Sequence, residues 1–208
     1  PTVTGLNICD NPVDIPATRF VINGLNIPAD PAAISAATVL SLLGCVKSWL
    51  ACVATFPKEF MKEITSCKWL KTTLGYQSPD GSILFDPKQS SICITDGPFI
   101  DESFYGSEIA SFKDALAAIG VTVDVRCGYG LVAQHLRSHK ETATISRIYL
   151  YLKECSWGPE KNKEGSDWIW IPNEKGGGEW VSPVSCVLHD QNNLFSQQMH
   201  VLGRYYDD

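Results

Sequence analysis

The segment that most constrains the fold runs from Pro31 to Thr55, where apolar residues dominate and Lys47 is the one charged residue. Within it, apolar side chains recur at steps of three and four residues, the pattern of one buried helix face. They are Val39, Leu42, Val46, Trp49 with Leu50, and Val53. Asp30 followed by Pro31 is typical of a helix start, and Pro57 stops a helix. The sequence therefore predicts one long core helix between the two prolines.

This segment is too short and too polar to favour a membrane span. Its uncharged run ends at Val46, before Lys47. A spanning helix needs about 20 predominantly apolar residues. Ser35, Thr38 and Ser41 interrupt the run as well. A helix buried in a protein core is the better interpretation, and we expect no membrane partner.

Charge is distributed unevenly along the 208 residues. Residues 1–56 contain five charged side chains, whereas charges are frequent from Lys58 onward. We therefore predict an apolar N-terminal segment with one long core helix over residues 1–56 and an α+β module over residues 57–208. One continuous domain is the alternative, since a chain of this length fits one or two domains.

The other predicted elements mix helices and short strands. Helices are expected over residues 58–67, 131–138 and 145–154, in a helix that Ser107 caps and Gly120 ends, and in the tail 194–206. Short strands are expected over residues 81–85, 91–95 and 121–125, with turns at residues 23–24 and 79–81. A Trp-rich hairpin should join residues 168–172 to 179–181 through the glycines at 176–178. Because no regular βαβ array is present, the predicted class is α+β with short antiparallel strands.

One glycine pattern invites a nucleotide-binding interpretation. Gly128, Gly130 and Ala133 match G-x-G-x-x-[GA] between the predicted strand 121–125 and the predicted helix 131–138. In that order of elements, small residues let the backbone approach a pyrophosphate at a helix N-terminus. Glu154 would have to serve as the acidic residue after a second strand, but residues 148–152 read better as helix. Dinucleotide binding is therefore kept as an alternative, and no cofactor is expected.

The eight cysteines are scattered and include no C-x-x-C pair. Zinc sites need ligands paired at short spacing, so we expect reduced, buried, structural thiols in an intracellular protein. Two sets could instead carry a cysteine nucleophile, and the first of them could also hold a metal. They are Cys186 with His189 and Asp190, and Cys127 with His135 and His139. Nothing in the spacing fixes their geometry, so no catalytic residue and no metal ligand is assigned.

Three tryptophans are the candidate protein-interaction residues. Trp168, Trp170 and Trp180 lie on the predicted hairpin, where they either cover one end of the core or anchor a protein partner. Nucleic-acid binding is a further alternative, but Arg137, His139 and Lys140 form only a small basic patch. A net charge of −6 disfavours contacts with phosphates.

A long ordered series of short motifs resembles a known family. The series spans residues 68–206 and includes Lys68-Trp-Leu-Lys-Thr72, Pro98-Phe-Ile-Asp101, Trp168-Ile-Trp-Ile-Pro172, Trp180-Val-Ser-Pro183 and Cys186-Val-Leu-His-Asp190. It resembles the region downstream of the ATPase module in very large plant proteins of the sacsin-like or NO VEIN-like kind. Those proteins carry an ATP-binding module of the histidine-kinase and heat-shock-chaperone type.

The resemblance implies one module of a chaperone-like or scaffolding ATPase, nuclear or cytoplasmic. It transfers no catalytic residue, because the D-x-G-x-G motif of the ATPase is absent. Since the chain begins at Pro1, we expect a piece of a longer or processed protein. The leading prediction is a non-catalytic structural or protein-interaction module whose partner the sequence does not name.

Overall fold

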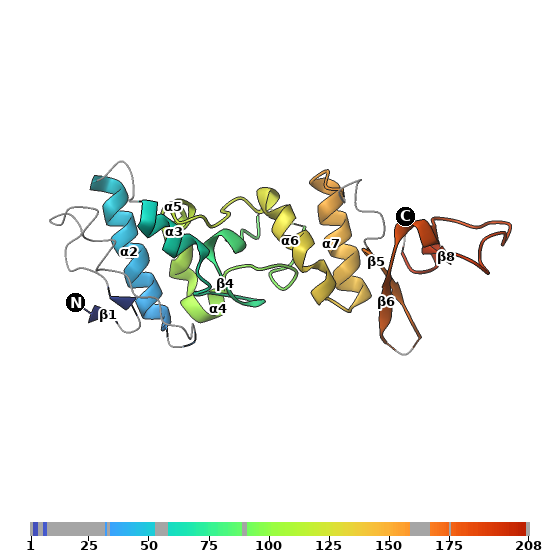
Figure 1. Cartoon of the computed structure of the whole chain (residues 1–208), viewed down its shortest axis with the longest axis horizontal. Helices are drawn as coiled ribbons and strands as arrows, with labels where there is room; N and C mark the ends of the chain where they lie inside the picture. The colour runs from blue at the N-terminus through green and yellow to red at the C-terminus, as the bar shows by residue number, and fades with distance from the viewer. Residues whose placement is uncertain are drawn as a thin grey trace.

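The computed structural model describes residues 2–3, 6–7, 32, 34–52, 58–88, 91–158, 167–174 and 176–206. The fold is α+β, as predicted: helices combine with strand pairs, and no described sheet has more than two strands. Figure 1 shows the elements arranged along the long axis nearly in chain order. The helix α2 lies at one end, α6 and α7 lie further along, and β5 to β8 form the opposite end.

The predicted long helix is α2, Ala36–Cys52. The helix begins at Ala36 because the Ser35 hydroxyl oxygen accepts the Thr38 N–H at 3.2 Å, the bond of an N-cap. The predicted start at Asp30-Pro31 lies outside the described residues, as do Val53 and Pro57. The apolar stripe is confirmed at Val39, Leu42, Val46 and Trp49, which are all buried, but it is wrong at Leu50, which is exposed.

The helix α2 contributes to a core that it shares with residues from 64 to 121. It packs against α4, Glu102–Tyr105, the 3-10 helix η3, Ser107–Phe112, and α5, Lys113–Ala118. Ile64 of α3, Lys58–Ser66, also belongs to this core. The predicted helix 58–67 is thereby confirmed, and α2 does not form a core of its own among the described residues.

A second apolar cluster surrounds α6, Tyr129–His135, and α7, Thr142–Glu154. Val132 and Leu136 face Ile145 and Ile148 in this cluster. The predicted helices 131–138 and 145–154 are confirmed, with η5, Leu136–Ser138, completing the first of them. No described helix has both the length and the apolar character that a bilayer span requires.

The predicted strands 81–85 and 121–125 are wrong as strands. Their bridges are isolated: Ile83 of the first segment bridges Phe99 and also Thr122 of the second. The first segment follows the 3-10 helix η2, Pro79–Gly81. The second ends where the Asp124 carboxylate accepts the Arg126 N–H and so begins η4, Val125–Gly128. Helical turns therefore leave too few extended residues for a ladder.

The predicted strand 91–95 is also wrong, because this segment turns around the buried Asp96. The Asp96 carboxylate accepts the Cys93 N–H at 2.8 Å. It also accepts two hydrogen bonds from the Arg147 guanidinium, at 2.6 and 2.7 Å. This ion pair fixes the turn to α7, since a buried carboxylate requires such partners.

The predicted helix from Ser107 to Gly120 is divided into η3 and α5, and Ser107 makes no capping bond. Capping falls instead to Asp101, whose carboxylate accepts the Ser103 and Phe104 N–H groups at the start of α4. Gly120 has φ +100°, the left-handed conformation expected where a helix ends.

Four strand pairs complete the described structure. The antiparallel pairs are β1, Thr2–Val3, with β2, Leu6–Asn7; β3, Leu70–Thr72, with β4, Gly75–Gln77; and β5, Ile169–Pro172, with β6, Gly178–Val181. A parallel pair joins β7, Cys186–Val187, to β8, His200–Val201. The predicted Trp-rich hairpin is thus confirmed, whereas the predicted turn at residues 23–24 lies outside the described residues.

The predicted helical tail 194–206 is wrong. Its residues form a loop, β8 and the short 3-10 helix η7, Leu202–Arg204. The cause is Asp190, whose carboxylate accepts the backbone N–H groups of Leu194, Phe195 and Ser196. Because the side chain bonds the N–H groups of three successive residues, it stabilises a loop in place of a helix.

Candidate functional site

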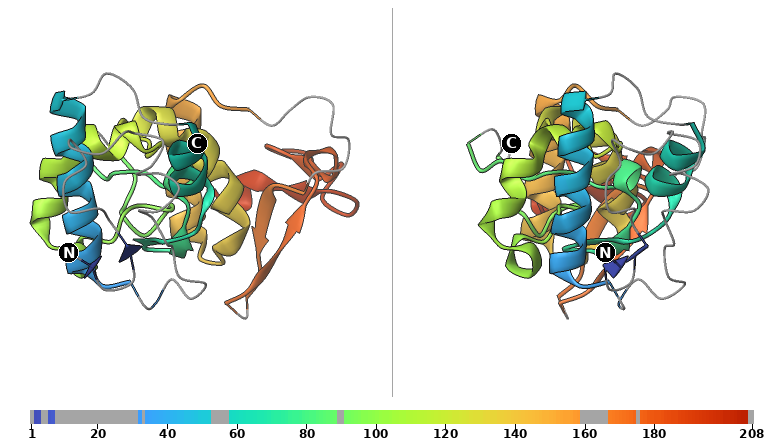
Figure 2. Two further views of the ribbon diagram at one scale, coloured as in Figure 1. Left: turned by 60° about the vertical axis from the view of Figure 1, so that its left-hand side comes forward. Right: turned by 90° about the vertical axis from the view of Figure 1, so that its left-hand side faces the viewer.

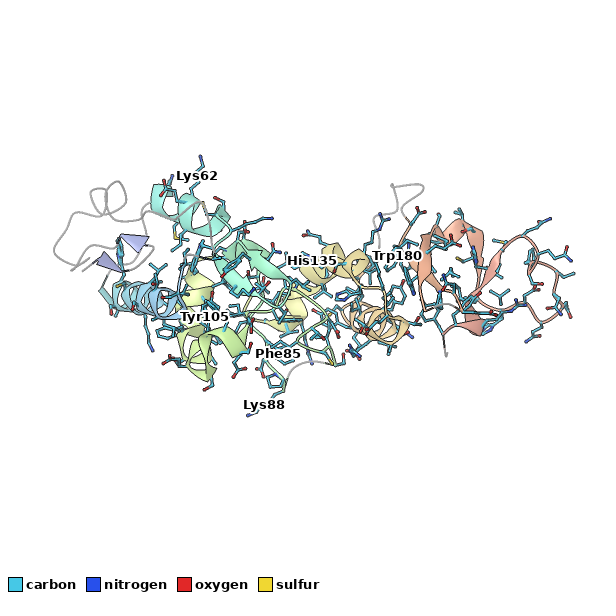
Figure 3. The ribbon with its side chains drawn as sticks, turned by 90° about the horizontal axis from the view of Figure 1, so that it is seen from below. Lys62, Phe85, Lys88, Tyr105, His135 and Trp180 are labelled. Atoms are coloured by element: carbon cyan, nitrogen blue, oxygen red, sulfur yellow. The ribbon has the colours of Figure 1, made fainter. Side chains whose placement is uncertain are left out.

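The three candidate tryptophans lie mainly inside the molecule. Trp170 is buried and packs on its cross-strand partner Trp180, with ring centroids 5.2 Å apart. Trp168 precedes β5 and makes edge-to-face contacts with Tyr149 and Trp157. Figure 3 shows Trp180 where the C-terminal strands meet α6 and α7. Trp170 is therefore a core residue, and Trp168 and Trp180 are half-buried.

Two tyrosine hydroxyls close the outer edge of β5. Tyr149 Oη accepts the Trp170 N–H at 3.0 Å and donates to the Trp168 carbonyl at 2.7 Å. Tyr206 Oη donates to the Trp170 carbonyl. An unpaired strand edge is an open template for another chain, and these hydroxyls occupy it. They also attach the hairpin to α7 and to the end of the described chain.

Exposed apolar side chains gather in the segment that follows the hairpin, residues 182–206, which we call the C-terminal unit. Five of the nine large apolar side chains exposed among the described residues belong to it. They are Val184, Leu188, Leu194, Phe195 and Tyr205. Val184, Leu188 and Leu194 are 82%, 70% and 72% exposed, more than any such residue elsewhere in the described chain. Such a concentration is typical of an interaction surface.

The C-terminal unit is held in one conformation by its own hydrogen bonds. The three backbone N–H groups on Asp190 fix the loop that carries Leu194 and Phe195. Desolvation alone would raise the pKa of Asp190, but these bonds outweigh it and hold the pKa below its ordinary value. The Gly203 N–H donates to the Leu188 carbonyl at 2.9 Å. The exposed side chains therefore stand on an ordered backbone, as an interface residue should.

The sequence did not single out these residues. We expected residues 194–206 to form a helix. The available signal was the run from Asp190 to Asn193, where turn-forming residues precede Leu194 and Phe195.

The glycine pattern at Gly128, Gly130 and Ala133 does not form a phosphate cradle. No strand precedes it, because residues 125–128 are the 3-10 helix η4, which leads directly into α6. A Cβ on Gly128 would lie 2.6 Å from Ile83 Cδ1, so packing explains this glycine. Ala133 packs against the second core cluster. The strand-to-helix order that a dinucleotide fingerprint requires is therefore missing.

The cysteine sets offer no activated nucleophile. Burial raises the pKa of Cys186, opposite to what a thiolate needs, and its thiol donates to the Ser182 carbonyl. Cys127 is exposed, and no hydrogen bond within the described chain joins it to His135 or His139. The six described cysteines are free thiols. The expectation that they are buried is wrong for Cys93 and Cys127, which are exposed, and the other four are only half-buried. The structure describes no side chain for Cys9 or Cys52.

The described residues form no metal-binding cluster, and Arg137 of the basic patch has a structural partner. Among the described residues there is no group of three or more His, Cys, Asp or Glu side chains able to hold a metal ion. In the small basic patch, the Arg137 guanidinium donates to the Asp167 carbonyl, so it serves the structure. A cavity of about 480 Å³ beside α7 contains Arg126 and Glu154, whose opposite charges offset each other. The Glu154 carboxylate there accepts the Ser91 hydroxyl at 2.7 Å.

Comparison with protein-family models, with curated proteins and with solved structures finds no match for this chain.

Proposed function

We propose that this chain is a non-catalytic protein-interaction module and that its docking surface is the C-terminal unit. The observation that carries the proposal is the group of exposed apolar side chains in the C-terminal unit, whose backbone is held by hydrogen bonds. Leu188 and Leu194 are among the most exposed of them. Leaving such groups in water forgoes about 25 cal/mol for each Å² of apolar surface that a partner would bury. A partner protein is the occupant that recovers this free energy.

Charge indicates what kind of protein surface would fit. The C-terminal unit itself is neutral, since Asp190 and Arg204 are its charged residues, but residues 167–181 and 207–208, which flank it in the sequence, contain five acidic side chains and one basic one. We therefore propose a partner that presents an apolar patch with a basic rim. Complementary charge of this kind speeds encounter and excludes wrong partners more than it adds affinity.

The resemblance to sacsin-like and NO VEIN-like proteins gives the proposal its wider setting. In that setting the chain is one interaction module of a chaperone-like or scaffolding ATPase in the nucleus or cytoplasm. The support is the series of motifs over residues 68–206 and nothing beyond it.

A photo-crosslinking amino acid placed in the full chain tests the proposal. At position 188 or 194 it should yield a discrete crosslinked protein whose contact peptide is apolar and rich in Lys or Arg. At position 150, also exposed but on α7, the same probe should yield none. Equal crosslinking at all three positions would contradict a specific surface. The crosslinked protein must then bind the purified chain directly and lose affinity for the Leu188→Ser/Leu194→Ser variant.

A further inference from the structure

The two edges of the β5–β6 hairpin differ in a way that points to a second contact. The register pairs Trp170 with Trp180 and Pro172 with Gly178. Trp170 directs both backbone groups to tyrosine hydroxyls, so it exchanges no hydrogen bonds with Trp180. In an antiparallel ladder, hydrogen-bonded and non-bonded pairs alternate. Two observations fit this alternation. The Asn173 N–H donates to the Gly177 carbonyl, so these two residues form a hydrogen-bonded pair. Pro172, which is paired with Gly178, has no N–H to donate and so fits a non-bonded pair.

It follows that the N–H and C=O groups of Gly178 and Trp180 point away from β5. No hydrogen bond to these outward groups comes from any described residue. The outer edge of β5 is closed by Tyr149 and Tyr206, while that of β6 has no such closure within the described chain. Figure 2 shows the hairpin extending from the α7 side of the molecule. Open edges of this kind accept an added strand.

We propose that the outer edge of β6 binds an extended, basic segment of a partner protein as an added antiparallel strand. This inference rests on the proposed function, because it specifies how a partner of the C-terminal region is held. Gly178 and Trp180 would exchange backbone hydrogen bonds with the segment. Glu179, which is exposed between them, would lie directly opposite one of its residues.

Charge selects the occupant. Residues 167–182 contain three carboxylates and one basic side chain, Lys175. A Lys or Arg opposite Glu179 forms a favourable cross-strand pair, and a β-branched residue opposite Trp180 packs on its ring. A second copy of this chain is disfavoured. Pairing Gly178 of each copy with Trp180 of the other would place the two Glu179 side chains directly opposite each other.

The probe is the peptide acetyl-Lys-Val-Lys-Thr-Lys-amide, titrated into the ¹⁵N-labelled full chain and followed by NMR. In the proposed register, Val lies opposite Trp180 and the central Lys opposite Glu179. We expect the amide signals of Gly178 and Trp180 to shift. Methylation of the Val backbone nitrogen should weaken binding about tenfold, because it removes an N–H that faces β6. Methylation of the central Lys nitrogen should leave binding unchanged, because that N–H points away.

A charge-reversal pair provides the protein-side control. Glu179→Lys should weaken binding of the peptide about tenfold, whereas Glu108→Lys, which changes the net charge equally at an exposed site on η3, should not. The inference is overturned if both methylated peptides bind alike, if both variants behave alike, or if no binding occurs. It is also overturned if Trp180 becomes protected by self-association of the chain.

The outcome separates this inference from the function on which it rests. The Leu188→Ser/Leu194→Ser variant should bind the peptide like the unmodified chain, because β6 is untouched. If the peptide does not bind the unmodified chain while the variant still loses its crosslinked partner, only the inference about the β6 edge is refuted. If the variant still binds the crosslinked partner, the proposal that the C-terminal unit is the docking surface is refuted.

Discussion

Gly128 and Gly130 lie two residues apart and face different surroundings. Beside Gly128 there is no room for a Cβ, since Ile83 is fully buried and lies 2.6 Å from where that atom would be. Around Gly130 nothing lies within 4 Å of a Cβ. One glycine thus serves packing, and the other is replaceable.

Alanine substitutions should therefore have opposite effects. Gly128→Ala should lower the free energy of unfolding by about 1–3 kcal/mol, the cost of overpacking a core. Gly130→Ala, within α6, should raise it by about 0.5–1 kcal/mol, because alanine loses less backbone entropy. Chemical denaturation of both variants measures this. Equal destabilisation would show that both glycines are needed, as a phosphate-binding turn would require.

At the scale of elements, the hairpin is held by Tyr149 as well as by its own ladder. Tyr149→Phe removes the hydroxyl that accepts the Trp170 N–H and leaves this buried group without its partner. We expect a loss of about 1–3 kcal/mol. Hydrogen exchange at the Trp170 amide should accelerate, while exchange within α2 should not change. Unchanged exchange at Trp170 would mean that the β5 edge does not depend on this hydroxyl.

The periodicity of the long helices made them predictable, and local side-chain bonds made other elements unpredictable. The stripe in α2 and the apolar face of α7 each repeat over several turns, so tertiary packing and pattern agree. Val121, Val123 and Val125 alternate like a strand, but Asp124 begins a 3-10 helix among them. Asp96 and Asp190 likewise bond nearby backbone N–H groups. The spacing of apolar residues in the sequence does not reveal these side-chain hydrogen bonds.

The sequence pointed to the hairpin but did not reveal the exposed residues of the C-terminal unit. The tryptophans directed attention to the C-terminal hairpin, where the open edge of β6 lies. Of the two roles left open for the tryptophans, covering the core and anchoring a partner, Trp170 has the first, since it is 3% exposed. Replacing Trp170 by alanine would therefore cost about 3–5 kcal/mol as a core truncation. It would test folding and not binding, so the informative variants are at Leu188 and Leu194.

For the whole molecule, buried tyrosines predict sensitivity to alkali. Burial raises the pKa of Tyr149 to about 12, and it also raises the pKa values of Tyr105, Tyr151 and Tyr206 above the ordinary value of 10.0. Above pH 10 the unfolded chain loses these protons while the folded chain retains them. The unfolded state then binds fewer protons, so the free energy of unfolding falls as the pH rises.

Tyrosinate absorbance and circular dichroism, recorded together from pH 9 to about 12, check this expectation. Ionisation of the buried tyrosines should coincide with loss of structure. Full ionisation of all seven tyrosines in a chain that stays folded would contradict the packing of these four.

As a whole molecule, we propose, the folded chain presents the C-terminal unit to a partner protein. The most direct measurement is the affinity of the crosslinked partner for three purified chains: the unmodified chain, Leu188→Ser/Leu194→Ser, and Leu150→Ser. All three should melt at similar temperatures, since the altered side chains are exposed. We expect at least about tenfold weaker binding for the double variant and unchanged binding for Leu150→Ser. Equal affinity for all three chains would contradict it.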